Sequence, residues 1–247
     1  MVAILVVSGV LWLALRRARN LLIGAVRQQA TVDDLSRYFD EPVARRIRKA
    51  GPALSAGTRR PAAILYIHLR GFSALSAELD PAEVVAILTA YQSRVVPLIQ
   101  RHGGVIDKYL GDGIMATFGA LKASGSYAAD AMRSIDAIVE DTASWRADTA
   151  LARLDPRKVG MAAACGPVIA GAVGDGRRLE YTVIGAPVNL AAKLEKHNKL
   201  LRSRALATWD LYEVALKQGY APARAIRKVQ SAIDGPARPC ELAIIYS

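Results

Sequence analysis

Residues 61–247 combine two periodic patterns of apolar and polar positions, and together these patterns predict an α+β domain. Short apolar runs bounded by turn residues indicate strands, whereas apolar residues recurring every three or four positions indicate helices. The predicted elements are a strand over 62–69, a helix over 81–102, a strand–turn–strand hairpin over 103–119, a helix over 127–149, strands over 159–165 and 180–184, a helix over 188–197, a strand over 205–208, a helix over 210–217, and strands near 226–233 and 240–246. The order strand-helix-strand-strand-helix-strand is a split βαβ arrangement, which predicts one sheet with its helices on one face.

The N-terminal stretch is apolar and then abruptly basic. Residues 2–15 carry no charge, and Arg16 and Arg17 follow directly. We expect residues 1–26 to form a membrane anchor, consistent with the last span of a longer chain. A cleaved signal peptide and a buried core helix are the alternatives. Arginine after the apolar run places the following domain on the cytoplasmic side of an inner or plasma membrane.

Residues 27–60 form a basic linker with a helical pattern. Apolar residues recur at a spacing of four, at Leu35, Phe39, Val43 and Ile47, and the pattern ends at Gly51 and Pro52. The globular domain is therefore expected from residue 61 onward.

The net charge of +11 is concentrated before the predicted domain. Residues 16–60 hold eleven basic and four acidic side chains, a net charge of +7. Aromatic residues do not alternate with these cations as a base-stacking surface would require, so a nucleic-acid partner is not expected. Cys165 and Cys240 lie in apolar or strand-like stretches and are expected to be buried free thiols.

The stretch "ILYIHLRGFSAL" (64–75) places one imidazole, His68, on an apolar strand just before an Arg-Gly turn. A polar residue tolerated on a strand face is the simpler interpretation. With "GGVIDKYLGDGIMATFG" and "RRLEYTVIGAPVNLAAKLE", however, this stretch resembles, in order and spacing, the catalytic domain of class III adenylyl/guanylyl cyclases. "LSRYFDEPVARRI" is also similar to the helical segment that often precedes such domains. The resemblance covers residues 35–247 and implies a ferredoxin-like βαββαβ fold.

The resemblance implies a role for each matching position. Such enzymes join the ribose 3′-oxygen of a nucleoside triphosphate to its α-phosphorus, release pyrophosphate, and use two divalent ions held by carboxylates. The positions that match are Asp112 as a metal ligand in an expected Asp112-Gly113 turn, the Leu69 carbonyl at the metal, Lys108 and Thr182 as readers of the base, Asn189 at the ribose, and Gly71 and Phe72 in the turn near the triphosphate. Each has a simpler interpretation as an ordinary turn, strand or surface residue. Two head-to-tail protomers would share each site.

Two positions depart from the family pattern. His68 stands where the first metal-binding aspartate is expected, and Lys193 stands where an arginine stabilises the transition state. Lysine keeps the positive charge but loses the bidentate geometry of arginine. A neutral imidazole removes a negative charge and suits Mn²⁺ better than Mg²⁺.

These features predict a membrane-anchored cyclase that converts ATP to cyclic AMP, with Mg²⁺ or Mn²⁺ as cofactor and weakened or Mn²⁺-dependent activity. Lys108 and Thr182 favour ATP over GTP. A catalytically inactive cyclase-like regulatory or dimerisation module is the alternative. The expected partner is a second copy of the chain in a head-to-tail homodimer, or a related cyclase that supplies the missing carboxylate.

Overall fold

A computed structural model of the protein describes residues 17, 43, 57–175, 179–233 and 239–247. The predicted membrane anchor (1–26) and nearly all of the predicted linker (27–60) lie outside these residues, so both stay predictions. The chain divides into two compact units, and every strand and helix named below belongs to the second of them, Pro52–Ser247.

The predicted strands and helices follow one another in the predicted order, and α3 and two short 3-10 helices are present in addition. They are β1 (Thr58–Leu69), α3 (Phe72–Ser76), α4 (Pro81–Arg101), β2 (Val105–Leu110), β3 (Gly113–Phe118), α5 (Tyr127–Thr142), two 3-10 turns (Trp145–Ala147 and Pro156–Lys158), β4 (Val159–Gly174), β5 (Leu179–Ile184), α6 (Ala186–His197), β6 (Ala205–Thr208), α7 (Trp209–Lys217), β7 (Arg227–Ser231) and β8 (Cys240–Tyr246). The predicted α+β fold is confirmed.

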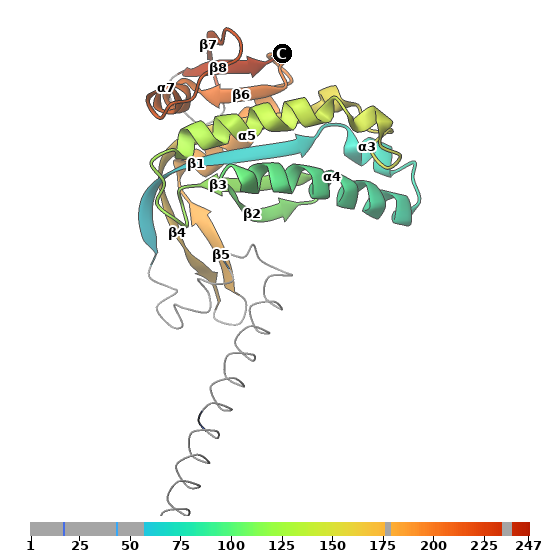
Figure 1. Cartoon of the computed structure of the whole chain (residues 1–247), viewed down its shortest axis with the longest axis horizontal. Helices are drawn as coiled ribbons and strands as arrows, with labels where there is room; N and C mark the ends of the chain where they lie inside the picture. Colours follow the sequence, from blue (N-terminus) through green and yellow to red (C-terminus); the bar gives the residue numbers. More distant parts are fainter. Residues whose placement is uncertain (1–16, 18–42, 44–56, 176–178, 234–238) are drawn as a thin grey trace, which may run out of the picture. The chain divides into compact units, whose positions relative to one another are not determined.

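All the strands belong to one sheet, with β1 near its centre (Figure 1). The strand order is β2-β3-β1-β4-β6-β8-β7, and β5 pairs with the far part of β4. Strand β1 is antiparallel to both β3 and β4. Its end therefore lies beside the β2–β3 turn and beside the start of β4.

Helices cover both faces of this sheet, so the expectation of helices on one face is wrong. Alternate β1 residues, such as Leu65 and Ile67, join the core that includes α4, α5 and α7. Ile64, one residue out of phase, joins a second cluster with Met115 of β3 and Ala191 of α6. A strand buried on both faces has an unbroken apolar run rather than an alternating one, and this explains the sequence of β1.

The β2–β3 turn consists of Gly111 and Asp112, not of Asp112 and Gly113 as predicted. Leu110 pairs with Gly113, which belongs to β3. Gly111 takes the positive φ of 65°, and glycine at the first turn position is the preference of type II′ hairpins. A Cβ at Gly113 would lie 3.3 Å from the Leu110 carbonyl oxygen and 3.4 Å from that of Ile67, so glycine fits this tight place as well.

Among the described residues, only α4 has the length and apolarity of a membrane span. It begins at a capping box in which Asp80 and Glu83 satisfy each other's backbone, with Pro81 in the first turn. Its residues Tyr91, Val95 and Ile99 are fully buried in the core against the sheet. Helix α4 is therefore accounted for as a core helix of this domain.

Candidate functional site

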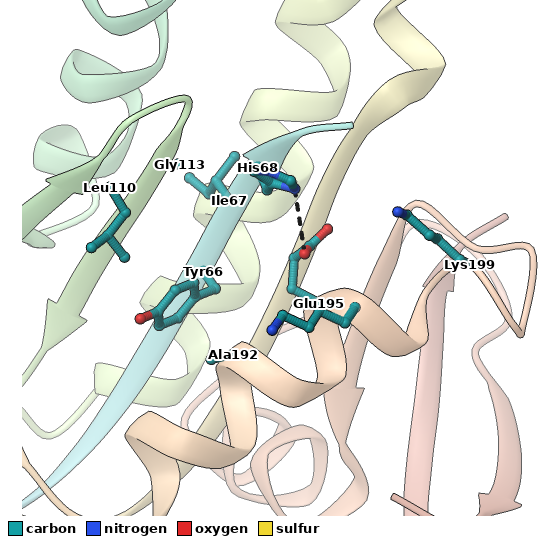
Figure 2. Close-up of a pocket in the computed structure, with 9 residues that line it drawn as sticks. Tyr66, Ile67, His68, Leu110, Gly113, Ala192, Glu195 and Lys199 are labelled. Carbon is teal, nitrogen blue, oxygen red and sulfur yellow. Dashed lines mark ion pairs between the residues drawn. The ribbon is translucent and has the colours of Figure 1, made fainter. Parts of the chain in front are cut away.

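Three side chains from three elements meet at the end of β1. His68 lies on β1, Asp112 lies in the β2–β3 turn, and Glu195 lies on α6 (Figure 2 shows His68 and Glu195). His68 Nε2 is 3.2 Å from Asp112 Oδ2, and His68 Nδ1 is 3.5 Å from Glu195 Oε2. The hydrogen bond to Glu195 raises the pKa of His68, partial burial opposes this, and the charge of Asp112 raises the pKa further. The protonated imidazolium is thus favoured between two carboxylates.

Glycines beside β1 make this convergence possible. His68 pairs with Gly113 on one side and with Gly160 on the other. A Cβ at Gly160 would collide with the Glu195 carboxylate and with Arg70 Nε. The Leu69 amide donates to the Asp112 carbonyl at 3.3 Å, which holds the β2–β3 turn against the end of β1.

Glu195 was not predicted from the sequence. Its side chain is only 8% exposed, and it lies on the buried face of α6 beside Ala191 and Leu194. An acidic residue in the apolar stripe of an amphipathic helix is the signal that would have found it. Arg70 is its counter-ion, with Nε 3.8 Å from Glu195 Oε1, and Arg70 also donates to the Ser203 carbonyl.

The donor chemistry at this point fits a divalent cation. Asp112 Oδ2 and Glu195 Oε1 are buried carboxylate oxygens that accept no hydrogen bond, although His68 and Arg70 lie within ion-pair distance of them. Buried polar atoms without a hydrogen bond are costly, and a cation could use them. Asp112 and the Leu69 carbonyl are the oxygen ligands that hard cations prefer, and His68 adds a nitrogen ligand suited to Mn²⁺. Among the described residues, however, no three or more His, Cys, Asp or Glu side chains already form a metal-binding group.

A cavity of about 520 Å³ opens beside His68, between β1 and α6 (Figure 2). Tyr66 and His68 line it from β1, and Ala192, Glu195 and Lys196 line it from α6. A smaller cavity of about 110 Å³ lies at the turn after β1. There Gly71 has a φ of 81° as the N-cap of α3, and Phe72 is buried.

A second cluster joins β2 to β5 and contains both predicted readers of the base. Lys108 forms an ion pair with Glu180 and lies 3.6 Å from the carboxylate of Asp107. Thr182 Oγ1 donates to Asp107 Oδ2 at 2.8 Å. Burial raises the pKa of Asp107 to about 6, although the Thr182 hydrogen bond and Lys108 both lower it. Asp107 was not singled out in the sequence.

Asn189 and Lys193 are not among the residues that line the cavity beside His68. Both are exposed on α6 and are one turn apart, whereas Ala192, Glu195 and Lys196 face the cavity. The structure therefore brings His68 to Asp112 and gathers Lys108 and Thr182 in one cluster with Asp107, and it leaves Asn189 and Lys193 exposed on α6.

Comparisons with known proteins agree on one family. Residues 54–204 match the family model "Adenylate and Guanylate cyclase catalytic domain". The chain is 31% identical over 244 residues to the uncharacterized protein Rv1320c of Mycobacterium tuberculosis, covering 92% of this chain and 41% of that relative. It thus spans about two fifths of the relative's length.

Solved structures of cyclases are also similar to this chain. The guanylyl cyclase Cya2 is 30% identical, with a TM-score of 0.61 over 76% of this chain and 92% of that one. The adenylyl cyclase CyaB from P. aeruginosa is 25% identical, with a TM-score of 0.64 over 77% and 96%. One of these two neighbours is a guanylyl and the other an adenylyl cyclase, so the likeness leaves the base unassigned.

Proposed function

The chain belongs to the adenylate and guanylate cyclase catalytic-domain family, and from this premise we propose that it converts ATP to cyclic AMP and pyrophosphate. One observation carries the choice of ATP. Lys108 and Thr182, the two predicted base readers, lie in one hydrogen-bonded cluster with Asp107. Lysine offers only donors, and a threonine hydroxyl can accept. This pair suits adenine, whose N1 accepts and whose 6-amino group donates.

At the reacting end, each residue has a proposed task. Asp112, His68 and the Leu69 carbonyl would hold a divalent ion, which when bound polarises phosphate oxygens and lowers the pKa of the 3′-hydroxyl. Lys193 would neutralise charge that develops on the α-phosphate. Asn189 would orient the ribose, and Gly71 and Phe72 would place backbone amides near the triphosphate.

We propose that a second chain completes the site. Asn189 and Lys193 are exposed on α6 and do not line the cavity beside His68. In a head-to-tail pair, the metal-binding residues of one protomer would face the base and ribose readers of the other. A related cyclase with an aspartate at the position of His68 could take the place of the second copy.

The ion pairs of His68 support the second candidate function, a regulatory module that binds nucleotide without turnover. An imidazolium between Asp112 and Glu195 supplies positive charge where a metal would otherwise be needed. In that case the domain would act by pairing with an active cyclase.

The deciding experiment is a cyclic-nucleotide assay on the full chain, with ATP or GTP and with Mg²⁺ or Mn²⁺. We expect cyclic AMP from ATP, more with Mn²⁺ than with Mg²⁺, and little cyclic GMP. Equal turnover of ATP and GTP would refute the assignment of ATP. No product with either metal, from a chain that still binds ATP, would favour the regulatory module.

A further inference from the structure

Asp107 accepts a hydrogen bond from the hydroxyl group of Thr182, and this bond fixes what Thr182 can offer to a purine base. We infer that Asp107 is a positioning residue that determines base specificity: by accepting from Thr182, it leaves Thr182 Oγ1 as an acceptor only, which selects 6-amino purines over 6-oxo purines. The inference rests on the proposed nucleotide cyclase function and deepens it.

A β-bulge in β2 lets Asp107 reach Thr182 of β5. Ile106 pairs with Ala116 and Lys108 pairs with Met115, so Asp107 is an extra residue in β2. Ile106 belongs to the core on the α4 and α5 side of the sheet. Met115, the partner of Lys108, belongs to the cluster on the opposite, α6 side. Without the bulge, neighbouring side chains would alternate between the faces. With it, Asp107 and Lys108 both reach the acidic and hydroxyl groups of β5.

The hydrogen bond restricts Thr182 to one role. A hydroxyl has one proton to donate and two lone pairs that accept. An unrestrained threonine can rotate and read either a donor or an acceptor on a base. Here the proton of Thr182 points to Asp107 Oδ2, 2.8 Å away, and an ionised carboxylate can only accept. Thr182 therefore has only lone pairs left for the base.

Lys108 supplies the hydrogen-bond donor that complements the acceptor of Thr182. Its ammonium group has only donors to offer, and Glu180 and Asp107 hold it beside Thr182. A donor and an acceptor side by side match N1 and the 6-amino group of adenine. In the same pose, hypoxanthine and guanine present an N1 donor and a 6-oxo acceptor. The donor of Lys108 would then face another donor, and the acceptor of Thr182 would face another acceptor.

The charge state of Asp107 provides a second way to examine this role. The groups that act on Asp107 are Lys108 on its own strand and Thr182 and Glu180 on β5. Burial raises the pKa of Tyr66 on β1, and the charge of Asp107 adds to this rise. Burial raises the pKa of Asp107 to about 6. Below that pH, the protonated carboxyl group can donate to Thr182, whose hydroxyl proton is then free to meet a 6-oxo group. Base selectivity should therefore weaken in mild acid.

A purely structural role for Asp107 is the competing explanation, because its hydrogen bond also ties β2 to β5. Asp136 offers a matched control. It accepts hydroxyl protons from Tyr220 and Tyr246, both at 2.8 Å, on helix α5 in the other layer of the domain. A change from Asp to Leu at either position removes the acceptor oxygens, which an Asn would keep, and roughly preserves the shape. Only the change at Asp107 should alter the choice of base.

The experiment measures kcat/KM of the full chain for ATP, ITP and GTP with Mn²⁺. ITP differs from ATP only at the Watson–Crick edge and isolates the 6-position. We expect Asp107→Leu to lower the ATP/ITP ratio at least tenfold, about 1.4 kcal/mol, and Asp136→Leu to leave the ratio unchanged. In a Thr182→Val background, Asp107→Leu should have no further effect, because it acts through the lost hydroxyl. An unchanged ratio in Asp107→Leu would overturn the inference.

Two further measurements keep the inference separate from the proposed function. Binding of 3′-deoxy-ATP and 3′-deoxy-ITP, which cannot cyclise, reports base selectivity without turnover. If the native chain prefers 3′-deoxy-ATP and Asp107→Leu does not, the inference stands even if no cyclic nucleotide forms. If the native chain binds both equally, the inference fails even if the chain is a cyclase. Should Asp107→Leu not fold, the ATP/ITP ratio of the native chain should fall as the pH is lowered through about 6, and a flat profile would overturn the inference.

Discussion

His68 Nε2 lies 3.2 Å from Asp112 Oδ2, the carboxylate that the family resemblance assigns to the metal. When His68 is protonated, the imidazolium neutralises part of the charge of Asp112. A divalent ion at this place must compete with the proton of His68. The pair therefore gives a physical reason for the weak metal response that we expect.

Replacing His68 with aspartate should strengthen metal binding. We expect His68→Asp to raise the Mg²⁺-supported rate of cyclic AMP formation at least tenfold, on the order of 1.4 kcal/mol of barrier. Lys193→Arg is the control, because it restores geometry rather than charge and should help less. A folded, dimeric His68→Asp protein that makes no product with either metal would instead support the regulatory module.

Removing the carboxylate of Asp112 should abolish the metal response. We expect Asp112→Ala to eliminate activity and to remove the increase in melting temperature that Mn²⁺ gives to the native chain, since ligands stabilise the folded state that binds them. Differential scanning fluorimetry with and without Mn²⁺ measures the second effect. A full Mn²⁺ shift in the Asp112→Ala protein would place the ion elsewhere.

Shared sites should allow two inactive variants to restore each other. Lys108→Ala and Asp112→Ala damage opposite halves of a head-to-tail site, so one site of their heterodimer keeps both native halves. Mixing equal amounts should restore about a quarter of native activity, because half of the dimers of a two-fold assembly are mixed and each carries one intact site. No recovery from variants that exchange subunits would exclude the head-to-tail arrangement.

Asp107 should reduce stability at neutral pH. Its folded pKa of about 6 is above the ordinary 3.8, so ionisation is disfavoured in the fold. Stability is therefore lost as the pH rises from about 4 to 6, by on the order of 1.4 kcal/mol per unit of pKa difference. We expect Asp107→Asn to raise the melting temperature relative to native chain more at pH about 7.5 than at pH about 5. Equal shifts at both values would show that Asp107 is not an ionised buried acid.

The N-terminal segment should decide the location of the protein. Deleting residues 1–30 should release the chain to the soluble fraction with its fold intact. The deletion removes the apolar run together with several nearby basic residues, each of which contributes about 1 kcal/mol to binding at an anionic leaflet. Circular dichroism and sedimentation check the two expectations. A truncated chain that still sediments with membranes at high salt would disprove the anchor.

The sequence predicted the order of the main elements because each of them is marked locally, by a helical period, an alternating pattern or a short apolar run between turn residues. It misplaced the β2–β3 turn by one residue, since "GDG" offers two possible positions and only the pairing of Leu110 with Gly113 selects one. It also missed the second helical layer. The apolar run of β1 is compatible with a strand covered on one face or on both, and the cover comes from α6, more than a hundred residues later.

The candidate site was predictable where a motif marks it and not where a tertiary contact creates it. His68 and Asp112 were paired by resemblance, and the structure brings them together. Glu195 reaches them only because Gly160 leaves space on β4. Asp107 acquires its role from a bulge, which depends on how β2 pairs with β3. The acidic residue in the apolar stripe of α6 could have drawn attention to Glu195, but its partners, and the bulge at Asp107, depend on contacts between distant segments.

The bulge at Asp107 also bears on how this domain can evolve. The strands pair regularly on both sides of the extra residue, Ile106 with Ala116 and Lys108 with Met115. Loss of a single in-frame codon would therefore leave a regular hairpin with Ile106 and Lys108 still facing their present layers. The residue that we assign to base discrimination could thus be gained or discarded in one genetic step, without an intermediate that fails to fold.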